Sequence, residues 1–417
     1  MLKQIKLRHV GPAESMDIPF APHLNILTGD NGLGKTFILD IAWWVLTRKW
    51  AGLPAWPDPK KKGRPSIEFK VAAKNIEGMA ECIQYNRNRQ DWETAKSKPT
   101  DKLVLYARAD GGISVWDKAR CSNSISKSGE DSTGFFNFSS DQIWSGLEEG
   151  KKVRCNGLIR DWDTWQYQKE KTFKIFSQVL KALSPESGEE MKPGKSTRLN
   201  VDDARSIPTV KLPYGMVPVT HLSSGMRRVL AFAYLLVWAW DEHKEAIQLT
   251  NLKPADRLII LFDEVEAHLH PRWQRAFLPA LLDVVNLLQQ DIDIQIIAST
   301  HAPLVLASVE PLFDEDRDRI VHVAFENGKV SAREIPWAKQ GDTVNWLVSD
   351  VFGLKQARSR EAEQAIEAAE TYMRGDLSDL PENLPDRDAI HNELKRVLAG
   401  HDPFWPRWIV TTEKESK

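Results

Sequence analysis

The chain has 417 residues, of which 42% are apolar and 27% are charged, and this composition excludes a disordered or fibrous protein. The length allows one composite domain or two to three small ones. Its 56 basic and 58 acidic residues leave a formal net charge of −2. No overall electrostatic field therefore attracts nucleic acid or membrane, and any nucleic-acid site has to be a local patch.

The sequence gives no sign of secretion or membrane insertion. Its longest apolar run, Val229 to Trp240, has twelve residues, whereas a membrane span needs about 20, so we expect a buried core helix. The first eight residues alternate like a strand and lack the apolar core of a signal peptide. The three cysteines lie far apart without a CxxC pair, which argues against a disulfide framework or zinc site. We expect a cytoplasmic protein with no membrane partner.

The first third of the chain reads as strand, turn, strand, glycine loop and helix, with the second strand at 24–27 and the helix at 36–47. Residues 48–65 hold four prolines and six basic residues against one acidic residue, and they predict an irregular segment. Short apolar runs between 67 and 116 predict an antiparallel meander. Residues 121–140 are rich in Ser and Gly and predict a mobile loop.

The remaining chain is mostly helical, with two further strands. Aromatic and aliphatic residues predict a helix over about 161–183, and Pro, Gly and charged residues at 184–213 predict a linker. The last third returns to alternation, with a helix from about 225, a strand at 258–262, a helix at 272–290 and a strand at 294–298. Beyond about residue 355 the patterns are helical and interrupted by proline.

One segment matches the phosphate-binding pattern G-x-x-x-x-G-K-[ST] between a strand and a helix. In such a loop the backbone wraps the phosphates, lysine neutralises their charge and the Ser or Thr hydroxyl ligates Mg²⁺. We therefore predict an ATP site with Mg²⁺, in which Thr36 is also a metal ligand. Its residues are Gly29, Asp30, Asn31, Gly32, Gly34, Lys35 and Thr36.

Two further strands deliver polar side chains to the expected site. The apolar run 258–262 predicts a parallel strand covered on both faces, and ligand chemistry lies at the carboxyl ends of such strands. At its end, Asp263 would hold Mg²⁺ through water and Glu264 would polarise the attacking water. The strand that precedes His301 is expected beside it, which predicts a γ-phosphate contact for His301 and, with Glu264, the catalytic pair.

Leu222 to Arg228 precede the long apolar helix. Ser223 and Gly225 fit simple helix capping by themselves, but their place in this order of motifs favours a role at the nucleotide.

Together these motifs resemble ABC-type ATPase heads of the SMC, RecF and OLD-like group over about residues 1–330. The runs 24–36, 263–271 and 299–303 resemble the AAA-family ATPases of prokaryotic phage defence in particular, of the Septu or retron-associated type. The resemblance implies an α/β P-loop NTPase fold: an ABC-type head with a parallel core sheet, an antiparallel β meander and a helical lobe. A helical C-terminal extension would follow.

The resemblance also implies partners and further site residues. Ser223, Ser224 and Gly225 would form the signature motif that contacts the nucleotide of the other protomer, so a homodimer or higher oligomer closes head to head over ATP. Residues 267–270 fall where a D-loop is expected, with His270 in place of its usual Asp. Gln142 and Gln166 both fit the Q-loop position, and we favour Gln166 as the nucleotide contact.

The implied domains are a head at 1–355 and an extension at 356–417. Within the head, the Walker A lobe and meander would occupy about 1–120, the helical lobe about 140–240, and the Walker B and His-switch part about 250–345. The 186 residues between Thr36 and Leu222 are too few for long coiled-coil arms. The acidic pair at 386 and 388 follows prolines without a preceding strand, which argues against an intrinsic Toprim-type nuclease.

Our main functional hypothesis is a dimeric ATP hydrolase that senses or regulates a separately encoded effector, a nuclease or toxin, in antiviral defence. The alternative is a RecF-like, ATP-gated DNA-binding protein of DNA repair, and a transporter ATPase is a distant third. The basic stretch 48–64 could hold DNA through counterion release, with Trp50 and Trp56 as stacking platforms, or could be a solvated loop. The aromatic end 402–408 would dock onto the head or bind a partner.

Overall fold

The computed structural model describes residues 1–58, 63–72, 80–121, 134–185, 190–289 and 292–414. The chain forms two compact units, Met1–Asp342 and Thr343–Lys417. The sequence placed the boundary at 355, so the first helix of the second unit, α8 (Thr343–Val348), falls in the part that we had expected in the head.

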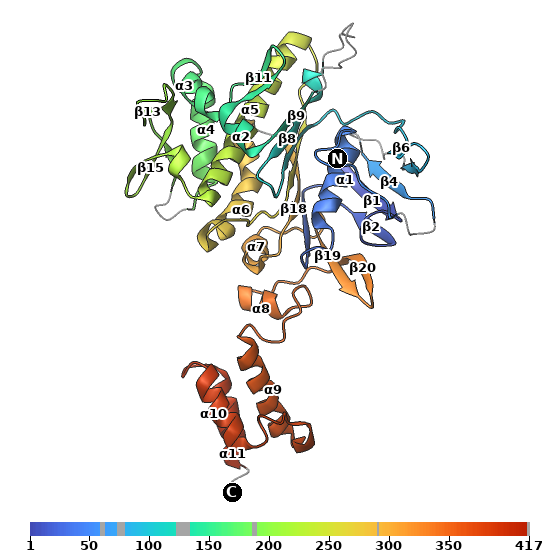
Figure 1. Ribbon diagram of the computed structural model, residues 1–417, viewed down its shortest axis with the longest axis vertical. Coiled ribbons are helices and arrows are strands. Elements are labelled where there is room, and N and C mark those ends of the chain that lie inside the picture. Colours follow the sequence, from blue (N-terminus) through green and yellow to red (C-terminus); the bar gives the residue numbers. More distant parts are fainter. Residues whose placement is uncertain (59–62, 73–79, 122–133, 186–189, 290–291, 415–417) are drawn as a thin grey trace. The chain divides into compact units, whose positions relative to one another are not determined.

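An eight-stranded sheet forms the centre of the first unit (Figure 1). Its order is β20-β19-β3-β18-β17-β7-β8-β9, and the five strands from β19 to β7 run parallel. The outer strands β20, β8 and β9 pair antiparallel. The bounds are β3 Leu24–Gly29, β7 Leu103–Ala107, β8 Ile113–Trp116, β9 Phe135–Phe138, β17 Arg257–Phe262, β18 Asp293–Ser299, β19 Asp318–Glu326 and β20 Lys329–Ile335.

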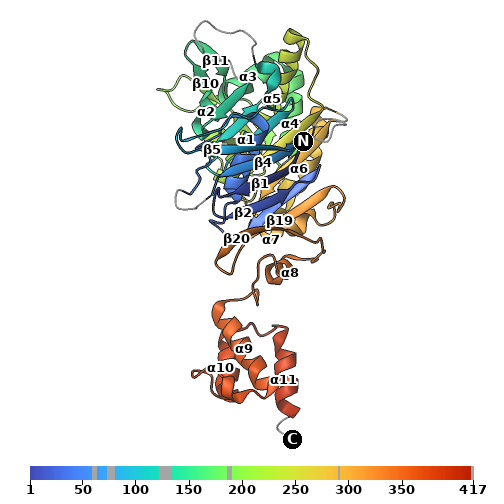
Figure 2. The ribbon, with the colours of Figure 1, turned by 90° about the vertical axis from the view of Figure 1, so that its right-hand side faces the viewer.

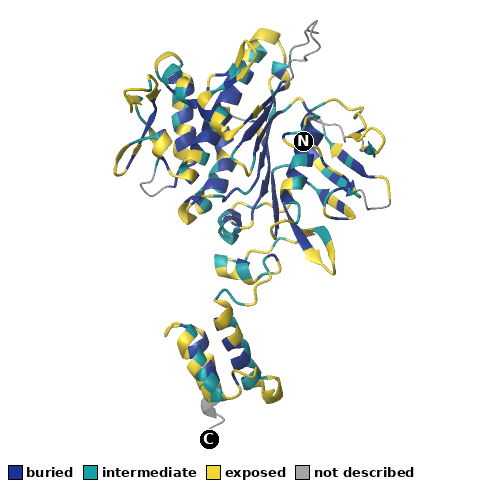
Figure 3. Cartoon of the chain, in the orientation of Figure 1, coloured by how far each residue is buried: buried dark blue, intermediate teal, exposed yellow. Residues whose placement is uncertain are grey.

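The central strands are apolar along their whole length because helices cover both faces of the sheet. Every residue of β3 is buried, as are Leu258–Phe262 in β17 (Figure 3). Helices α5 (Ser224–Thr250) and α6 (Pro271–Leu288) cover one face, and α1 (Lys35–Thr47) covers the other (Figure 1). On the first face the rings of Phe232, Phe262 and Phe277 pack within about 6 Å of one another.

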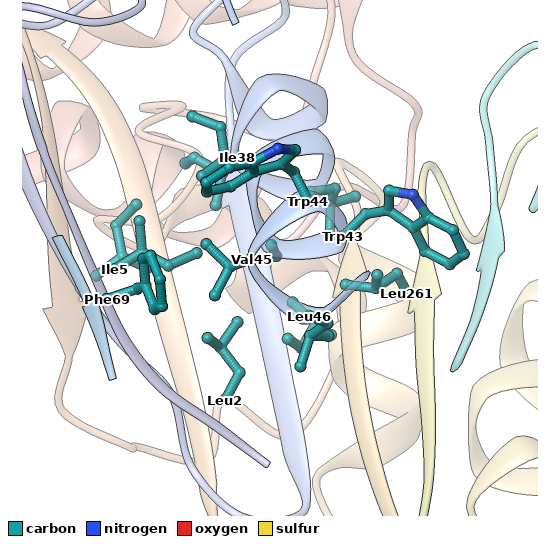
Figure 4. Close-up of a cluster of buried hydrophobic side chains, with 14 of the residues drawn as sticks. Leu2, Ile5, Ile38, Trp43, Trp44, Val45, Leu46, Phe69 and Leu261 are labelled. Atoms are coloured by element: carbon teal, nitrogen blue, oxygen red, sulfur yellow. The ribbon is translucent and has the colours of Figure 1, made fainter. Parts of the chain in front are cut away.

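A second, antiparallel sheet lies beyond α1 in the order β2-β1-β4-β5-β6 (Figure 2). Its strands are β1 Leu2–Arg8, β2 Ser15–Pro19, β4 Ser66–Val71, β5 Glu81–Asn86 and β6 Asp91–Trp92. Helix α1 therefore lies between two sheets and has almost no polar face. Figure 4 shows Ile5 and Phe69 of the second sheet on one side of the helix and Leu261 of the core sheet on the other.

The predicted meander over 67–116 was wrong as a single antiparallel unit. Strands β4 to β6 join the second sheet, whereas β7 crosses to the core sheet and pairs parallel with β17. The physical reason lies in β7 itself, since all five residues of Leu103–Ala107 are buried. Such a continuous apolar run is typical of a parallel strand that is covered on both faces.

The helical lobe also differs from the prediction in detail. The expected helix over 161–183 is two helices, α3 (Leu158–Gln168) and α4 (Glu170–Ala182), because Lys169 leaves the helical conformation with φ −123°. The lobe also contains α2 (Ser140–Ser145), β10 (Leu147–Glu149) and β11 (Lys152–Cys155). The expected linker at 184–213 holds short strands: β12 Lys192–Pro193, β13 Thr197–Arg198, β14 Ser206–Ile207 and β15 Thr209–Leu212; β16 Gly215–Pro218 follows. Of the expected mobile loop, 122–133 lie outside the described residues, and 135–138 form β9.

The second unit has a hydrophobic core of its own. Beyond α8 it contains α9 (Arg360–Arg374), α10 (Arg387–Val397) and α11 (Phe404–Lys414). Two residues of the aromatic end, Phe404 and Trp408, are buried in this core, while docking of this end onto the head or a partner stays a prediction. Asp386 caps α10 by accepting a hydrogen bond from the amide of Ala389 (2.8 Å). Among the described residues of both units, none of the helices has the length and apolarity to span a membrane.

Candidate nucleotide-binding site

The glycine loop connects β3 directly to α1 and depends on backbone conformations that favour glycine. Gly29 has φ +132°, and a Cβ there would lie 2.0 Å from the carbonyl oxygen of Val323 on β19. Gly34, the residue before α1, has φ +101°. Because a glycine offers no side-chain cap, the first N–H groups of α1 remain available to an anion. The loop therefore has the form of a phosphate cradle.

Lys35 lies inside this loop and is almost fully buried. Its Nζ donates to the carbonyl oxygens of Gly29 (2.7 Å) and Asp30 (2.8 Å). Burial lowers the pKa of Lys35, and nearby carboxylates oppose this shift, Glu266 most strongly and then Asp263. A phosphate anion would compensate the buried ammonium better than two carbonyl dipoles do.

Thr36 and Asp263 meet as the sequence predicted. The Thr36 hydroxyl donates to Oδ2 of Asp263 (2.8 Å), although the residues are 227 positions apart. Asp263 is fully buried, and its Oδ1 accepts a hydrogen bond from the Ser299 hydroxyl (2.6 Å). A hydroxyl and a carboxylate are oxygen ligands that suit Mg²⁺, so these residues fit the metal.

Glu264 turns sharply away from the end of β17. Its φ is +49°, a left-handed conformation that is uncommon for a residue with a side chain. The Glu264 amide donates to the Ser299 hydroxyl (2.8 Å), which fixes the turn. Within the described part of the chain its half-buried carboxylate makes no hydrogen bond. The group is therefore available to a water molecule, as a general base requires.

His301 follows β18, which lies between β3 and β17 in the core sheet. Its ring is 43% exposed, and its Nδ1 lies 3.0 Å from Oε1 of Glu266. The His301 amide donates to the same oxygen (2.8 Å). The sheet thus brings Thr36, Asp263 and His301 to one edge, since each follows the carboxyl end of a neighbouring parallel strand.

The signature segment, Leu222–Arg228, begins α5. The Ser223 hydroxyl caps the helix by accepting from the amide of Met226 (3.4 Å), and both Ser223 and Ser224 are exposed. Gly225 lies so close to the expected D-loop that a Cβ would be 2.4 Å from the carbonyl oxygen of His268. A groove of about 970 Å³ opens here, lined by Ser223, Gly225, Tyr214, Met226, Leu269 and Trp273 among others.

His270 is a cap for α6, where its side chain accepts from the amide of Arg272. Among the described residues no group of three or more His, Cys, Asp and Glu side chains could hold a metal ion.

The two candidate Q-loop residues lie in the helical lobe. Gln166 is on α3, which packs against α2 and α4, and its buried Oε1 has no partner within the described ranges. Gln142 completes the capping box of α2 with Ser139. No hydrogen bond between described residues connects either glutamine to the glycine loop, which leaves Gln166 as a prediction.

Three residues that organise the site were not predicted from the sequence. Ser299 joins Asp263 to Glu264, and Glu266 holds His301. Arg228 reaches from α5 to donate to the Asp263 carbonyl oxygen (2.6 Å), with its guanidinium 5.4 Å from the Phe262 ring centre. Each lies in a segment that the motifs already marked, but only the fold reveals these long-range contacts.

Asp40 is a further acidic group near the metal ligands, one turn along α1 from Thr36. Its Oδ1 accepts a hydrogen bond from the Tyr106 hydroxyl on β7 (3.0 Å). Burial raises the pKa of Asp40 to about 6.

Residues 24–307 match the family described as "AAA domain, putative AbiEii toxin, Type IV TA system". The chain belongs to this family. The AAA-domain chain is also 23% identical to the Septu protein PtuA of Bacillus thuringiensis over 390 residues, which cover 88% of this chain and 87% of that protein. It is 43% identical to the "Retron Vc95 probable ATPase" of Vibrio cholerae over 51 residues, 12% of this chain and 9% of that protein.

Among solved structures, the chain is similar to an SMC head bound to the C-winged helix domain of ScpA, at 15% identity and a TM-score of 0.42. That likeness covers 81% of this chain and 98% of the SMC head. RecF with ATP is similar at 11% identity and a TM-score of 0.39, over 80% and 97%. The predicted fold class, an ABC-type P-loop ATPase head, is confirmed, as is the resemblance to Septu and retron ATPases.

Proposed function

We propose that this AAA-domain chain is an ATP hydrolase with Mg²⁺ as its cofactor. The observation that carries the proposal is the chain of contacts from Thr36 through Asp263 to Ser299 and the Glu264 amide. It supports a metal-ligating role for Thr36 and Asp263 beside the glycine loop, where the Glu264 carboxylate makes no hydrogen bond to the described residues. Such an arrangement suits phosphoryl transfer to water, which needs orientation and charge neutralisation rather than covalent chemistry.

Each residue has a separate task in this proposal. Lys35 and the α1 N-terminus would hold the phosphates, and Thr36 and Asp263 would hold the metal, which would supply charge neutralisation. Glu264 orients the attacking water and accepts its proton. The His301 ring is partly exposed at the same sheet edge, from which it would contact the γ-phosphate.

Phosphate release from ATP tests this proposal directly. Lys35→Ala should weaken nucleotide binding because it removes the buried counter-charge, whereas Asp263→Asn should bind ATP but respond poorly to Mg²⁺. Lys329→Ala, on the exposed start of β20, is the matched control and should behave like the wild type. Magnesium-dependent hydrolysis that persists in Lys35→Ala would contradict the assignment of the glycine loop.

The wider role follows from the signature segment and the relatives. Ser223 and Ser224 at the start of α5 are exposed and so accessible to a second protomer, which supports a head-to-head homodimer or a higher oligomer. Similarity to a Septu protein over most of the chain supports a cytoplasmic sensor or regulator in antiviral defence that acts on a separately encoded effector, a nuclease or toxin. A nuclease or toxin gene beside this one, and co-purification of its product, would support the role; neighbouring permease genes would contradict it.

A basic groove favours one second candidate, an ATP-gated DNA-binding protein. The groove measures about 640 Å³, and its charged lining is Arg48, Glu81, Lys96, Lys98, Asp101 and Lys118. Lys60, Lys61 and Lys62 of the expected basic stretch lie outside the described residues, while Trp50 stacks on Trp44 and Trp56 remains exposed. Salt-sensitive duplex binding that strengthens with ATP and weakens in Lys98→Glu would support this function. Duplex binding that is insensitive to salt or to ATP would refute this function.

A further inference from the structure

Glu266 occupies an unusual position for an acidic residue. Its side chain is 6% exposed, and one oxygen, Oε1, accepts from both the amide and the ring of His301 (2.8 and 3.0 Å). The other oxygen, Oε2, is buried and has no hydrogen-bond partner in the described part of the chain. A buried carboxylate with only one of its two oxygens hydrogen-bonded lowers the stability of the fold, so an apolar residue would stabilise the fold better at this place.

The contact also fixes the chemical form of the histidine. A carboxylate can only accept, so the Nδ1 nitrogen that faces Oε1 must carry the hydrogen. The opposite nitrogen, Nε2, is then the one left for a ligand at the exposed edge of the ring. Because the same oxygen holds the backbone amide, both the ring and the chain at His301 are constrained together.

We propose that Glu266 is a positioning residue for His301: it holds the hydrogen on Nδ1 and turns Nε2 toward the γ-phosphate, so that the imidazolium form of the ring presents an Nε2–H donor to that anion. This inference rests on the proposed ATPase function. Glu266 does not touch the nucleotide and acts through His301 alone. Loss of the carboxylate would let the ring rotate and exchange tautomers, and a displacement of about 1 Å in a catalytic group costs up to about 100-fold in rate.

The first test is a double-mutant cycle on hydrolysis. Glu266→Ala should lower kcat about 10- to 100-fold with KM changed less than about twofold, because binding residues are untouched. In a His301→Ala background the same change should cost less than about twofold, since its target is gone. Losses that multiply in full would overturn the proposal, because Glu266 would then act independently of His301.

Conservative replacements separate positioning from charge. Glu266→Gln keeps an acceptor oxygen at the same distance and should recover most of the wild-type kcat, whereas Glu266→Asp is shorter and should be intermediate. If the kcat of Glu266→Gln is as low as that of Glu266→Ala, the negative charge beside Lys35 is what hydrolysis requires, and the proposal fails. Both variants keep a polar side chain, so they remain informative should Glu266→Ala fail to fold.

The last test does not depend on hydrolysis. In ¹⁵N-histidine NMR spectra, with the His301 signals identified by their loss in His301→Ala, the wild type and Glu266→Gln should show a protonated Nδ1. Glu266→Ala should shift His301 toward the other tautomer. Unchanged His301 signals in Glu266→Ala would refute the proposal. A wild type with the expected tautomer but no ATP turnover would instead refute the proposed function alone.

Discussion

Replacing Ser299 with alanine should damage both stability and hydrolysis, because one hydroxyl serves two buried partners. Ser299 is fully buried, donates to Asp263 (2.6 Å) and accepts from the Glu264 amide (2.8 Å). A hydrogen bond to a charged group contributes about 1.5–3 kcal/mol, and an amide left unpaired costs about 1–3 kcal/mol. After partial relaxation we expect about 3 kcal/mol of lost stability, or a Tm lower by about 4 °C for a unit of this size.

The functional loss should exceed what the lower Tm explains. Asp263 and Glu264 are held by the same hydroxyl, so kcat at 25 °C should fall at least about tenfold. The control is Ser308→Ala, which removes a hydroxyl that donates to the Val305 carbonyl (2.7 Å) on α7. Differential scanning fluorimetry and phosphate release would be measured on both variants. If Ser299→Ala matches Ser308→Ala in Tm and kcat, the reasoning about this hydroxyl is refuted.

Three further perturbations test other parts of the molecule. In Gly225→Ala, the new Cβ would meet the His268 carbonyl at 2.4 Å, so the start of α5 must shift. ATP-dependent dimerisation, measured by light scattering, should therefore weaken, while nucleotide binding stays near the wild-type value. Asp40→Asn removes a carboxyl whose pKa burial raises to about 6, so the cost of its charged form, incurred as pH rises from about 4 to 6, disappears. Its Tm gain over the wild type should be about 2 °C larger at pH 8 than at pH 5, and a gain that shrinks with pH would contradict this sign. Trp408→Ala should lower the stability of the second unit by about 3–5 kcal/mol and make that unit sensitive to proteolysis, whereas nucleotide binding by the head persists. The control Ile409→Ala changes a 43% exposed side chain, so its second unit should remain resistant to proteolysis.

Much of the site could be predicted from the sequence because its parts are local. The glycine loop, the acidic end of β17 and His301 each follow a short apolar strand, and parallel strands bring their carboxyl ends to one edge. In agreement with that rule, Thr36 and Asp263, which the sequence assigned to the same metal, lie within 2.8 Å of each other in the structure.

What the sequence could not provide depends on contacts between distant segments. Lys102–Tyr106 read as part of a meander, and only its pairing with β17 distinguishes it as a core strand. The short strands between 192 and 218 have too few residues for a periodic signal and exist because they pair with one another. Glu266 and His301 are 35 positions apart, so no local pattern could indicate that one holds the other.

The most direct test of the central claim is the amount of ATP that remains bound to Glu264→Gln. Glutamine keeps the size of the side chain but removes the carboxylate that would accept the proton of the attacking water, so turnover should fall by about two or more orders of magnitude. The variant would be incubated with Mg²⁺ and ATP, separated from free nucleotide, and analysed for bound nucleotide and molecular mass. We predict a dimer that retains unhydrolysed ATP. A Glu264→Gln protein that hydrolyses ATP at the wild-type rate and carries only ADP would contradict the account.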